Sequence, residues 1–503
     1  MEKLMLKKTY VLIAAAIASL VAPLVAQAQD AGALLDLLVK KKLITDQEAE
    51  EVRADLTKQT AETAAGKWKL SAPITEIELY GDARVRYEGR SGETGRPNTL
   101  DPYHDTFQRN RERYRLRLGL RGTLVDDWFF GIRLETSTNP RSTNVTFGDD
   151  TSTAPGPFAK NSDSINVGQA YIGYKGFHDV TLTAGKMPNP FVNTLMVWDG
   201  DINPEGVAEQ WKHTFNLSFG GGSAATEAAS YGKDGKNVAA AVTTEPTKMT
   251  LDVFANFAQF VYDDTNPDNP VGPQPVANGH NVPNTDAWMF GWQVGAKLNF
   301  TKTTYVQIAP TLYDYSGAGD TFNKFYSGDP DLLVGTPPVR TSLNQTGVNS
   351  LLVYDMPAEF GWSWHDIPFR VFGDFAVNFD GDERAAAAGH PDKGDQRYAY
   401  QIGVGVGKIK AKHDWAISAW WQHTEQYALD PNLVDSDVFD SRVNMEGFAV
   451  TIGYALSDAV IANLTYARGR PSDHDLGTGG VGDIGLNPLT RYQVFQADLN
   501  LKF

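Results

Sequence analysis

The sequence predicts an all-β fold: a 16-stranded antiparallel transmembrane β-barrel with a short helical segment before it. Three observations support this prediction. Apolar and polar residues alternate with a period of two in successive segments from Ile74 onward, as they do on the two faces of a strand. The connections between these segments are alternately short and long, which is typical of a barrel with tight turns at one end and long loops at the other. The chain also stops on such a strand, at Phe503.

The first 28 residues predict a signal peptide. Three lysines precede an apolar run at residues 10–21, and the small residues Ala26 and Ala28 fit a cleavage site. We therefore expect the protein to be exported. No later run of about 18 apolar residues follows, so no helix is expected to span a bilayer.

Residues 29–73 predict a periplasmic helical segment and linker. Leu34, Leu37 and Leu38 recur at the spacing of one helix face, and Thr45 to Glu48 fits a capping box that begins a second helix. Helices this short do not bury their own apolar faces and are marginally stable alone. We expect the segment to pack against copies of itself or against the barrel, with a loosely ordered extension as the alternative.

Residues 74–503 predict the transmembrane β-barrel domain. In its first strand, Leu79, Val85 and Tyr87 share one face and charged residues occupy the other. A two-residue turn at Asp126-Asp127 leads into a later strand, and long polar loops are expected at 89–108, 188–205 and 428–443, among others. Counting the segments gives 16 strands. The stretch 220–248 is long where a short turn is due, so it could hide a hairpin that would make the number 18.

The last strand closes the barrel in this interpretation. Leu499, Leu501 and Phe503 lie on one face, and Asp498 lies on the other. A terminal aromatic residue after alternating apolar residues resembles the sorting signal of bacterial outer-membrane barrels. This resemblance implies that Phe503 is an assembly signal and that the barrel-assembly machinery is a partner. We expect the strand to pair with the first one, over Ile77 to Tyr87.

Composition excludes several classes of protein. A formal net charge of −16 and a pI of about 5.0 argue against a general nucleic-acid-binding protein, which would carry a basic face. Without cysteine, neither a disulfide framework nor a thiolate metal site can form. The mean hydropathy of −0.34 is far too low for a helical membrane protein, whereas a barrel is polar inside and in its loops. The nine histidines show no paired spacing that suggests zinc.

One stretch is similar to a known family. Residues 184–191, Ala-Gly-Lys-Met-Pro-Asn-Pro-Phe, and residues 197–206, Val-Trp-Asp-Gly-Asp-Ile-Asn-Pro-Glu-Gly, resemble the third outer loop of the bacterial "putative porin" family, which is similar to the phosphate-selective porins. The order of signal peptide, helical segment and alternating strands resembles that family as well. The resemblance implies a homotrimeric channel in the bacterial outer membrane, in contact with lipid and lipopolysaccharide. Its third loop, residues 188–205, would fold into the lumen and narrow it.

The strand pattern places a row of arginines inside the barrel, because the apolar face is expected to contact lipid. The expected pore-lining residues are Arg84, Arg86, Arg113, Arg115, Arg117, Arg121 and Arg133. The third loop offers acidic residues opposite them, at Asp199, Asp201 and Glu205. A basic wall facing an acidic loop predicts a transverse field, and an unopposed wall predicts an anion channel. A rigid ion-pair belt is the third interpretation, in which the arginines pair with Glu78, Asp82, Glu88 and Glu135.

These features predict an outer-membrane porin: a water-filled channel for passive diffusion of small hydrophilic solutes and ions, with an arginine-lined wall that tunes its charge preference. The alternatives are an anion- or phosphate-selective channel and a structural or adhesive outer-membrane protein. No nucleophile motif supports an enzyme. No cofactor is expected, although oxygen-rich stretches at 263–269 and 380–382 could bind Ca²⁺ in the outer loops.

Overall fold

The described part of the chain begins just before the first predicted strand. The computed structural model describes residues 71–94, 106–138, 142–148, 164–217, 249–266, 276–277, 280–281, 285–316, 333–334, 339–340, 350–388, 390–478, 484 and 489–503. All but the first two belong to the compact unit that runs from Pro73 to Phe503. The predicted signal peptide, the helical segment and the stretch 220–248 lie outside the described residues. Where the chain is described, no helix is both long and apolar enough to cross a membrane.

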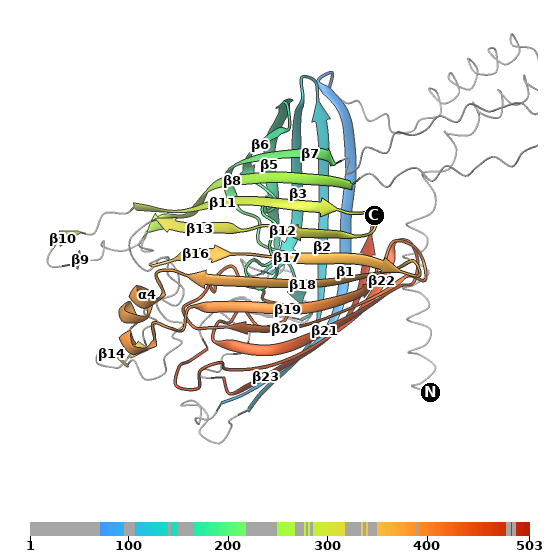
Figure 1. Ribbon diagram of the computed structural model, residues 1–503. Helices are drawn as coiled ribbons and strands as arrows, with labels where there is room; N and C mark the ends of the chain where they lie inside the picture. The colour runs from blue at the N-terminus through green and yellow to red at the C-terminus, as the bar shows by residue number, and fades with distance from the viewer. Residues whose placement is uncertain are drawn as a thin grey trace, which may run out of the picture. The chain divides into compact units, whose positions relative to one another are not determined.

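The described residues form a closed antiparallel β-barrel (Figure 1). Its sheet contains 19 strand segments. One of them, β4, is a two-residue piece of a loop, and two strands are each split into two pieces, so the wall has sixteen strands. The wall segments are β1 (Ile74–Glu93), β2 (Thr106–Leu124), β3 (Trp128–Ser137), β5 (Ser164–Phe177), β6 (Val180–Lys186), β7 (Glu205–Leu217), β8 (Met249–Asn266), β11 (Thr285–Asn299), β12 (Tyr305–Ile308), β13 (Thr311–Ser316), β16 (Leu352–Asp355), β17 (Ala358–Trp364), β18 (Ile367–Asn378), β19 (Tyr398–Gly407), β20 (Trp415–Thr424), β21 (Met445–Ala455), β22 (Val460–Arg470) and β23 (Arg491–Lys502).

Short elements occupy the long connections at one end of the barrel. They are β4 (Val145–Thr146), β9 (Val276–Ala277), β10 (His280–Asn281), β14 (Leu333–Val334), β15 (Val339–Arg340), the helix α4 (Gly381–Ala387) and the 3-10 helix η1 (Pro391–Lys393). The opposite end has tight turns. At Asp126 and Asp127 both residues adopt positive φ angles (59° and 64°), as a two-residue hairpin turn matched to the strand twist requires. The predicted turn at these two residues is confirmed.

The number of strands is settled by the pairing of β7 with β8. The two strands are direct neighbours, from Gly206 opposite Phe260 to Leu217 opposite Met249. The long stretch between them therefore joins adjacent strands, and no further hairpin enters the wall at this point. The barrel has 16 strands, as predicted, and not 18.

Two prolines cause the two strand interruptions. Pro310 separates β12 from β13, and Pro357 separates β16 from β17. Proline has no N–H to donate to the ladder, so a strand that contains it is broken at that residue. The breaks lie side by side, because the Ala309 N–H donates to the Pro357 carbonyl (3.0 Å). The wall therefore remains continuous across both of them.

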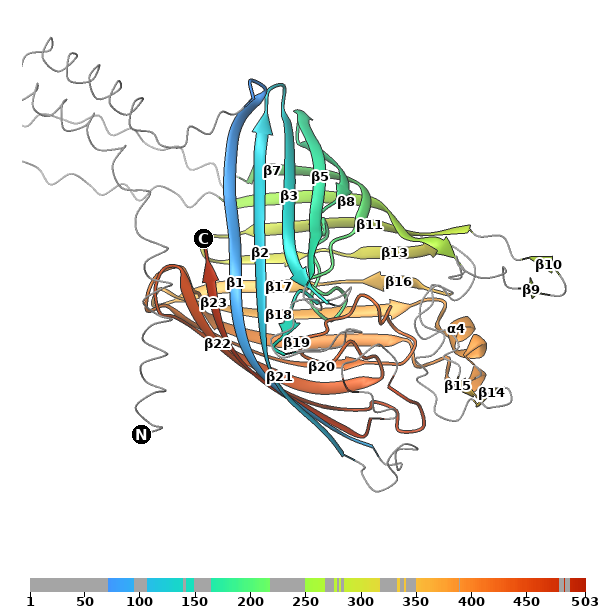
Figure 2. The same ribbon diagram turned by 180° about the vertical axis from the view of Figure 1, so that it is seen from behind.

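The last strand closes the barrel on the first (Figure 2). β23 pairs with β1 from Lys502 opposite Asp82 to Arg491 opposite Glu93. The predicted partner is correct, but the expected range of Ile77 to Tyr87 is shifted: the pairing begins later in β1 and extends further toward the long loops. Phe503 continues the ladder, because its backbone exchanges hydrogen bonds with Gly81 (3.1 and 2.9 Å).

The position of the Phe503 ring explains why the residue opposite it, Gly81, is a glycine. A Cβ atom on Gly81 would lie 2.7 Å from the Phe503 ring and 2.4 Å from the Arg117 carbonyl. The aromatic ring covers a strand position that has no side chain of its own. Phe503 is 55% exposed and lies on the outer surface of the wall. Its expected role in assembly stays a prediction.

The bounds predicted for the loop at residues 89–108 are wrong at both ends. β1 continues to Glu93 and β2 begins at Thr106, and these two residues are paired. A β-ladder joins backbone groups whatever the side chains are. The polar side chains here also find buried partners, since Arg90 donates to Asp440 at 2.6 Å.

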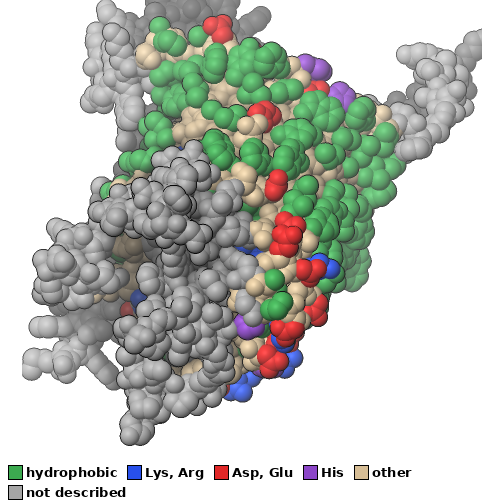
Figure 3. Space-filling view, turned by 90° about the vertical axis from the view of Figure 1, so that its left-hand side faces the viewer, with side chains coloured by type: hydrophobic (Ala, Val, Ile, Leu, Met, Phe, Trp, Pro, Cys, Tyr) green, Lys and Arg blue, Asp and Glu red, His purple; other side chains and the backbone are tan. Residues whose placement is uncertain are grey.

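The two faces of the wall differ in polarity, as the alternation predicts. Large apolar side chains are exposed on one face of nearly every strand, for example Leu79 (54%), Ile402 (61%) and Leu499 (47%). Figure 3 shows hydrophobic side chains spread over the outer wall. The opposite face is polar and buried, with Arg86, Gln293 and Gln496 each at most 3% exposed. Burial of charged groups on this face means that something other than water fills part of the interior.

Candidate functional site

Two loops from the long-loop end lie in the interior of the barrel. Inner loop A (residues 187–204) joins β6 to β7, and inner loop B (residues 425–444) joins β20 to β21. Most residues of inner loop B are buried. The loops contact each other, because the Asp199 N–H donates to the Leu433 carbonyl (2.6 Å) and the Asp435 N–H donates to the Leu195 carbonyl (3.2 Å). The sequence suggested inner loop A as a lumen loop and gave no indication that inner loop B is buried.

Inner loop A is attached to the wall by polar side chains of the strands. Gln293 of β11 accepts from the Val192 N–H (3.0 Å) and donates to the Val192 carbonyl (2.8 Å). Thr194 hydrogen-bonds to Asp374 of β18. These bonds come from two strands that are far apart in the chain, and they fix the path of the loop across the interior.

An apolar cluster holds the two inner loops together. Phe191 and Trp198 of inner loop A pack edge-on against Phe260 of β8 (ring centroids 6.2 and 6.3 Å apart). Leu429 and Leu433 of inner loop B belong to the same buried cluster. Burial of such side chains contributes about 1.5–3 kcal/mol each. The two loops are therefore part of a packed core and do not hang freely in the lumen.

Arginines of β1 face inner loop B. Arg86 forms two hydrogen bonds with Asp498 of β23 (2.6 and 3.0 Å) and an ion pair with Asp437 of inner loop B (2.8 Å). Arg84 lies 3.8 Å from Asp437 and donates to the Asn144 side chain. Both arginines are less than a tenth exposed. They thus connect the first strand, the last strand and an inner loop.

Arginines of β2 face inner loop A. Arg115 and Arg117 both bind the carboxylate of Asp82 on β1 (2.7 Å each). Both also approach Asp201 of inner loop A, at 3.7 and 3.4 Å. Asp201 accepts a further hydrogen bond from the Thr143 hydroxyl (2.8 Å). The acidic loop and the basic wall are thus in direct contact.

A third group of charges surrounds Glu88, a fully buried carboxylate of β1. Arg111 donates to it at 2.7 Å, Arg90 at 3.3 Å, and Arg113 lies 3.6 Å away. Arg90 also binds Asp440 of inner loop B (2.6 Å). Neither Arg90 nor Arg111 was predicted as a site residue. Arg90 falls within residues 89–108, which were expected to be loop, and Arg111 lies shortly after them on β2. The available signals were the alternation of Arg90 with Glu88 on β1 and of Arg111 with Arg113 on β2.

The two remaining expected arginines lie at other levels of the wall. Arg133 pairs with Glu135 on its own strand (2.8 Å). Arg121 pairs with Glu78 (2.6 Å), and both side chains are about half exposed. All four carboxylates considered for an ion-pair belt therefore pair with arginines. We call this set of paired charges the arginine network: Arg84, Arg86, Arg90, Arg111, Arg113, Arg115, Arg117, Arg121 and Arg133 with their acidic partners.

The three acidic residues expected in the third loop have different surroundings. Asp201 contacts the arginines. Asp199 contacts inner loop B instead, since its carboxylate accepts from the Ser436 N–H (2.9 Å) and hydroxyl (2.8 Å). Glu205 is the first residue of β7 and pairs with Lys186 (2.8 Å), on the strand face that carries the exposed Val207. Glu205 thus lies apart from the arginine network.

A cavity of about 490 Å³ separates inner loop A from part of the wall. Trp198 and Ile202 line it on the loop side, and Trp420 lines it on the wall side. Two cationic groups reach it, Arg133 and Arg370, the second paired with Glu359 at 3.1 Å. The cavity thus combines aromatic faces with arginine and amide groups, a lining suited to polar solutes.

Asp199 gives the inner loops a dependence on pH. Burial, and to a smaller degree the negative charges of Asp201 and Asp437, raise the pKa of Asp199 to about 6. Burial beside Asp199 and Asp437 also raises the pKa of Asp435 well above its ordinary value. The ionised form of Asp199 is therefore disfavoured in the folded protein. Its cost to stability is absent below the ordinary pKa of 3.8 and is fully present once the pH has risen through about 6.

We expect lowering the pH from 7 to 5 to shift the zero-current potential toward anions, because Asp199 loses its negative charge in this range. The shift should be centred near the pKa of about 6. Asp199→Asn should remove this step while leaving the potential at pH 5 close to that of the wild type. The measurement is the zero-current potential in a KCl gradient at several pH values. An unchanged pH profile in Asp199→Asn would assign the titration to Asp435 or another group.

The stretch considered for Ca²⁺ at 380–382 is engaged in other contacts. Helix α4 begins at Gly381, and Asp382 lies 3.4 Å from Arg397. The side chains of the other stretch, 263–269, lie outside the described residues. Within the described ranges, one group of histidines and carboxylates is close enough to hold a metal ion, and it includes neither stretch.

Comparisons with solved structures give engineered variants of the porin of Rhodopseudomonas blastica. Two of them share 10% and 9% sequence identity with this chain, with TM-scores of 0.37 and 0.36. A third structure, described as "Asymmetric conductivity of engineered proteins", shares 11% identity with a TM-score of 0.37. In all three cases the match covers 85% of this chain and 100% of the other. No curated protein sequence matches the chain.

A protein-family comparison gives a match over most of the chain. The family is described as "Putative porin", and its pattern matches residues 13–360. This range includes the β1 and β2 arginines, inner loop A and the strands as far as the start of β17. The closed 16-stranded barrel with an apolar outer wall and a polar interior is the architecture that a porin requires. The chain therefore belongs to this porin family.

Proposed function

We propose that the protein forms a channel through which small hydrophilic solutes and ions diffuse passively. The supporting observation is the cavity between inner loop A and the wall, which carries arginine, amide and aromatic groups inside a closed barrel. Porins of this kind lie in the bacterial outer membrane, so the exposed apolar wall contacts lipid. The short turns would face the periplasm and the long loops the outside.

The arginine network sets the charge preference of the channel in this proposal. Its arginines are paired with carboxylates, so the interior carries little unopposed positive charge. An ion in a narrow polar passage responds to the remaining imbalance. We therefore expect a weakly selective channel, and not the strong anion preference that an unopposed arginine row would give.

Further parts of the proposal follow from membership of the family. The chain would be exported by its signal peptide, inserted by the barrel-assembly machinery and assembled as a homotrimer. Lipopolysaccharide would surround the long loops. Inner loop A, which includes nearly all of residues 188–205, would form the constriction.

Planar-bilayer recording tests the proposal. Purified protein should insert in discrete steps and conduct KCl with a small zero-current potential in a concentration gradient. Barrel folding is checked separately by heat-modifiable migration on a gel. A folded barrel without conductance would contradict the channel function and would favour a structural or adhesive role.

A further inference from the structure

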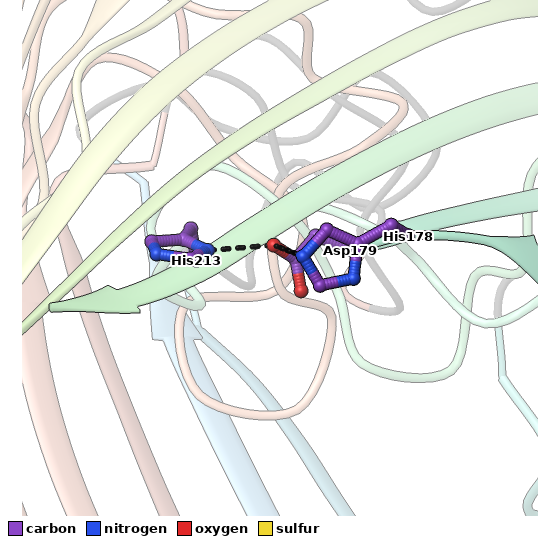
Figure 4. Close-up of side chains that lie close together, drawn as sticks. All are labelled: His178, Asp179 and His213. Carbon is purple, nitrogen blue, oxygen red and sulfur yellow. Dashed lines mark hydrogen bonds and ion pairs between the residues drawn. The ribbon is translucent and has the colours of Figure 1, made fainter.

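Two histidines and one aspartate converge at the short-turn end of the barrel. His178 and Asp179 form the two-residue connection between β5 and β6, and His213 lies on β7 (Figure 4). The Nδ1 atom of His213 lies 2.6 Å from Oδ2 of Asp179, and Nε2 of His178 lies 3.3 Å from the same oxygen. One ligand atom from each residue lies within 4.8 Å of the others. This cluster could not be predicted from the sequence, because the two histidines are far apart in the chain and belong to different elements.

We propose that His178, Asp179 and His213 bind a divalent transition-metal ion, Zn²⁺ first of all. Two imidazole nitrogens and one carboxylate oxygen are a ligand set that suits Zn²⁺, whereas Mg²⁺ and Ca²⁺ prefer oxygen ligands alone. Three protein ligands would leave a fourth position of a tetrahedral ion for water or another donor.

The two separations that involve Asp179 can be compared with those of a zinc site. Zinc bonds to nitrogen and oxygen are about 2.0–2.1 Å long, so neighbouring ligand atoms of a tetrahedral site lie roughly 3.3–3.4 Å apart. The separation between His178 and Asp179 is already 3.3 Å. The shorter contact between His213 and Asp179 is a direct ion pair or hydrogen bond, and a small rotation of the carboxylate would open it to the required distance.

The backbone holds the three residues in place before any ion arrives. Asp179 has a positive φ of 60°, which sets the direction of the connection. Its carbonyl accepts a hydrogen bond from the Lys212 N–H (3.0 Å), the residue next to His213. β7 is in turn paired on its other side, with His213 opposite Val253 of β8. Preorganisation of this kind reduces the ordering cost of binding.

The environment of His213 favours an oriented imidazole. Its ring is stacked with that of Trp211 (11° between the planes) and packs against Phe215 with ring centroids 4.5 Å apart. The His178 side chain is 90% exposed and the His213 side chain is 37% exposed, so an ion can reach the cluster from solvent. The nearest described cation on β7, Lys212, is directed to Asp252 at 3.7 Å.

The chain contains a matched control. His365 and Asp366 form the two-residue connection between β17 and β18, with positive φ angles of 48° and 62°. This is the same His-Asp dipeptide in another two-residue connection between neighbouring strands, although His178 lacks the positive φ of His365. It is not part of any described metal-binding group. If Zn²⁺ bound non-specifically to isolated surface histidines, it would bind at this turn as readily as at His178.

Isothermal titration of the untagged, chelator-treated full-length protein with ZnCl₂ tests the proposal. We expect a site with one Zn²⁺ per chain that persists in millimolar Mg²⁺. His178→Ala and His213→Ala should each weaken the Zn²⁺ affinity more than about 10-fold. Loss of a residue that only orients a metal ligand already costs about 10–100-fold in metal affinity. His365→Ala should leave the affinity unchanged.

A second readout separates loss of the site from loss of the fold. Zn²⁺ should raise the Tm of the wild type and of His365→Ala but not that of His178→Ala. The His178 side chain is exposed, so its replacement is not expected to disturb folding, and a missing Tm shift would report loss of the metal site. The proposal is overturned if the wild type binds no Zn²⁺ at its histidines. Equal weakening by His365→Ala and His178→Ala would overturn it too, because it would mean non-specific binding.

Discussion

Replacing Arg113, Arg115 and Arg117 by alanine shifts the zero-current potential of the channel toward cations. These side chains face the interior from one strand, and their removal leaves Asp82 and Asp201 without their arginine partners. A unit charge about 5 Å from an ion in water contributes roughly 0.8 kcal/mol. Three such charges, reduced by salt screening over a Debye length of about 10 Å, amount to roughly 1.5 kcal/mol. This energy lowers the barrier for a cation and raises it for an anion, each by about tenfold in permeability, so we expect the ratio of cation to anion permeability to rise by roughly 100-fold at most.

Two controls separate charge from structure in this experiment. The corresponding triple substitution by lysine keeps the charge and should keep the potential near that of the wild type, although it loses the bidentate geometry. The double variant Arg468→Ala with Arg491→Ala should have no effect, because both arginines lie on the outer face. Arg468 is opposite the exposed Phe448, and Arg491 shares its strand face with the exposed Phe495. Removing one partner of a buried pair costs about 3–5 kcal/mol, so the folding of each variant has to be verified first. An unchanged potential in a folded triple alanine variant would mean that these residues lie away from the ion path.

Removing inner loop B has the second large effect that we expect. A short Gly-Ser link in place of residues 428–443 would delete most of a buried segment that contributes Leu429, Leu433 and Val434 to the interior core. Conductance should rise roughly twofold or more, because a 16-stranded barrel without internal packing leaves a wide aqueous channel. The variant would also lose Asp437 and Asp440, the partners of Arg86 and Arg90.

The same deletion should therefore move the zero-current potential toward anions, opposite to the effect of the arginine substitutions. Single-channel recording gives both quantities at once. A deletion of equal length within residues 224–239 is the control, since this stretch joins the neighbouring strands β7 and β8. A folded variant with wild-type conductance would show that inner loop B does not limit the passage of ions.

Local sequence patterns were sufficient for the wall of the barrel. The alternation of apolar and polar residues and the tight turn at Asp126 depend only on neighbouring residues, and both are found in the structure. The first and last strands also pair as predicted. The polar ends of β1 and β2 were missed because residues such as Arg90 are typical of loops. Their place in a strand depends on distant partners such as Asp440.

The interior was harder to predict for the same reason. Residues 428–443 contain four aspartates and one asparagine, a composition that favours a solvated loop. Their burial depends on arginines more than 300 residues away in the chain, as in the pair of Arg90 with Asp440. Strand parity was enough to name the charged residues that line the interior. Whether these residues form a transverse field or a set of ion pairs depends on side-chain positions, which parity does not give. Arg115 and Arg117, for example, share Asp82 on the neighbouring strand.

The seam between β1 and β23 has a consequence for the order of folding. Arg86 and Asp498 are 412 residues apart in the chain, so their contact is among the last that a growing strand meander can make. Until then β1 and β23 are open edges, which invite pairing with other chains. Closure removes both edges in one step and gives Arg86 its partner. A barrel arrested before that step would expose the guanidinium group of Arg86 without its partner and two unpaired strand edges. We expect this intermediate to be the species that aggregates.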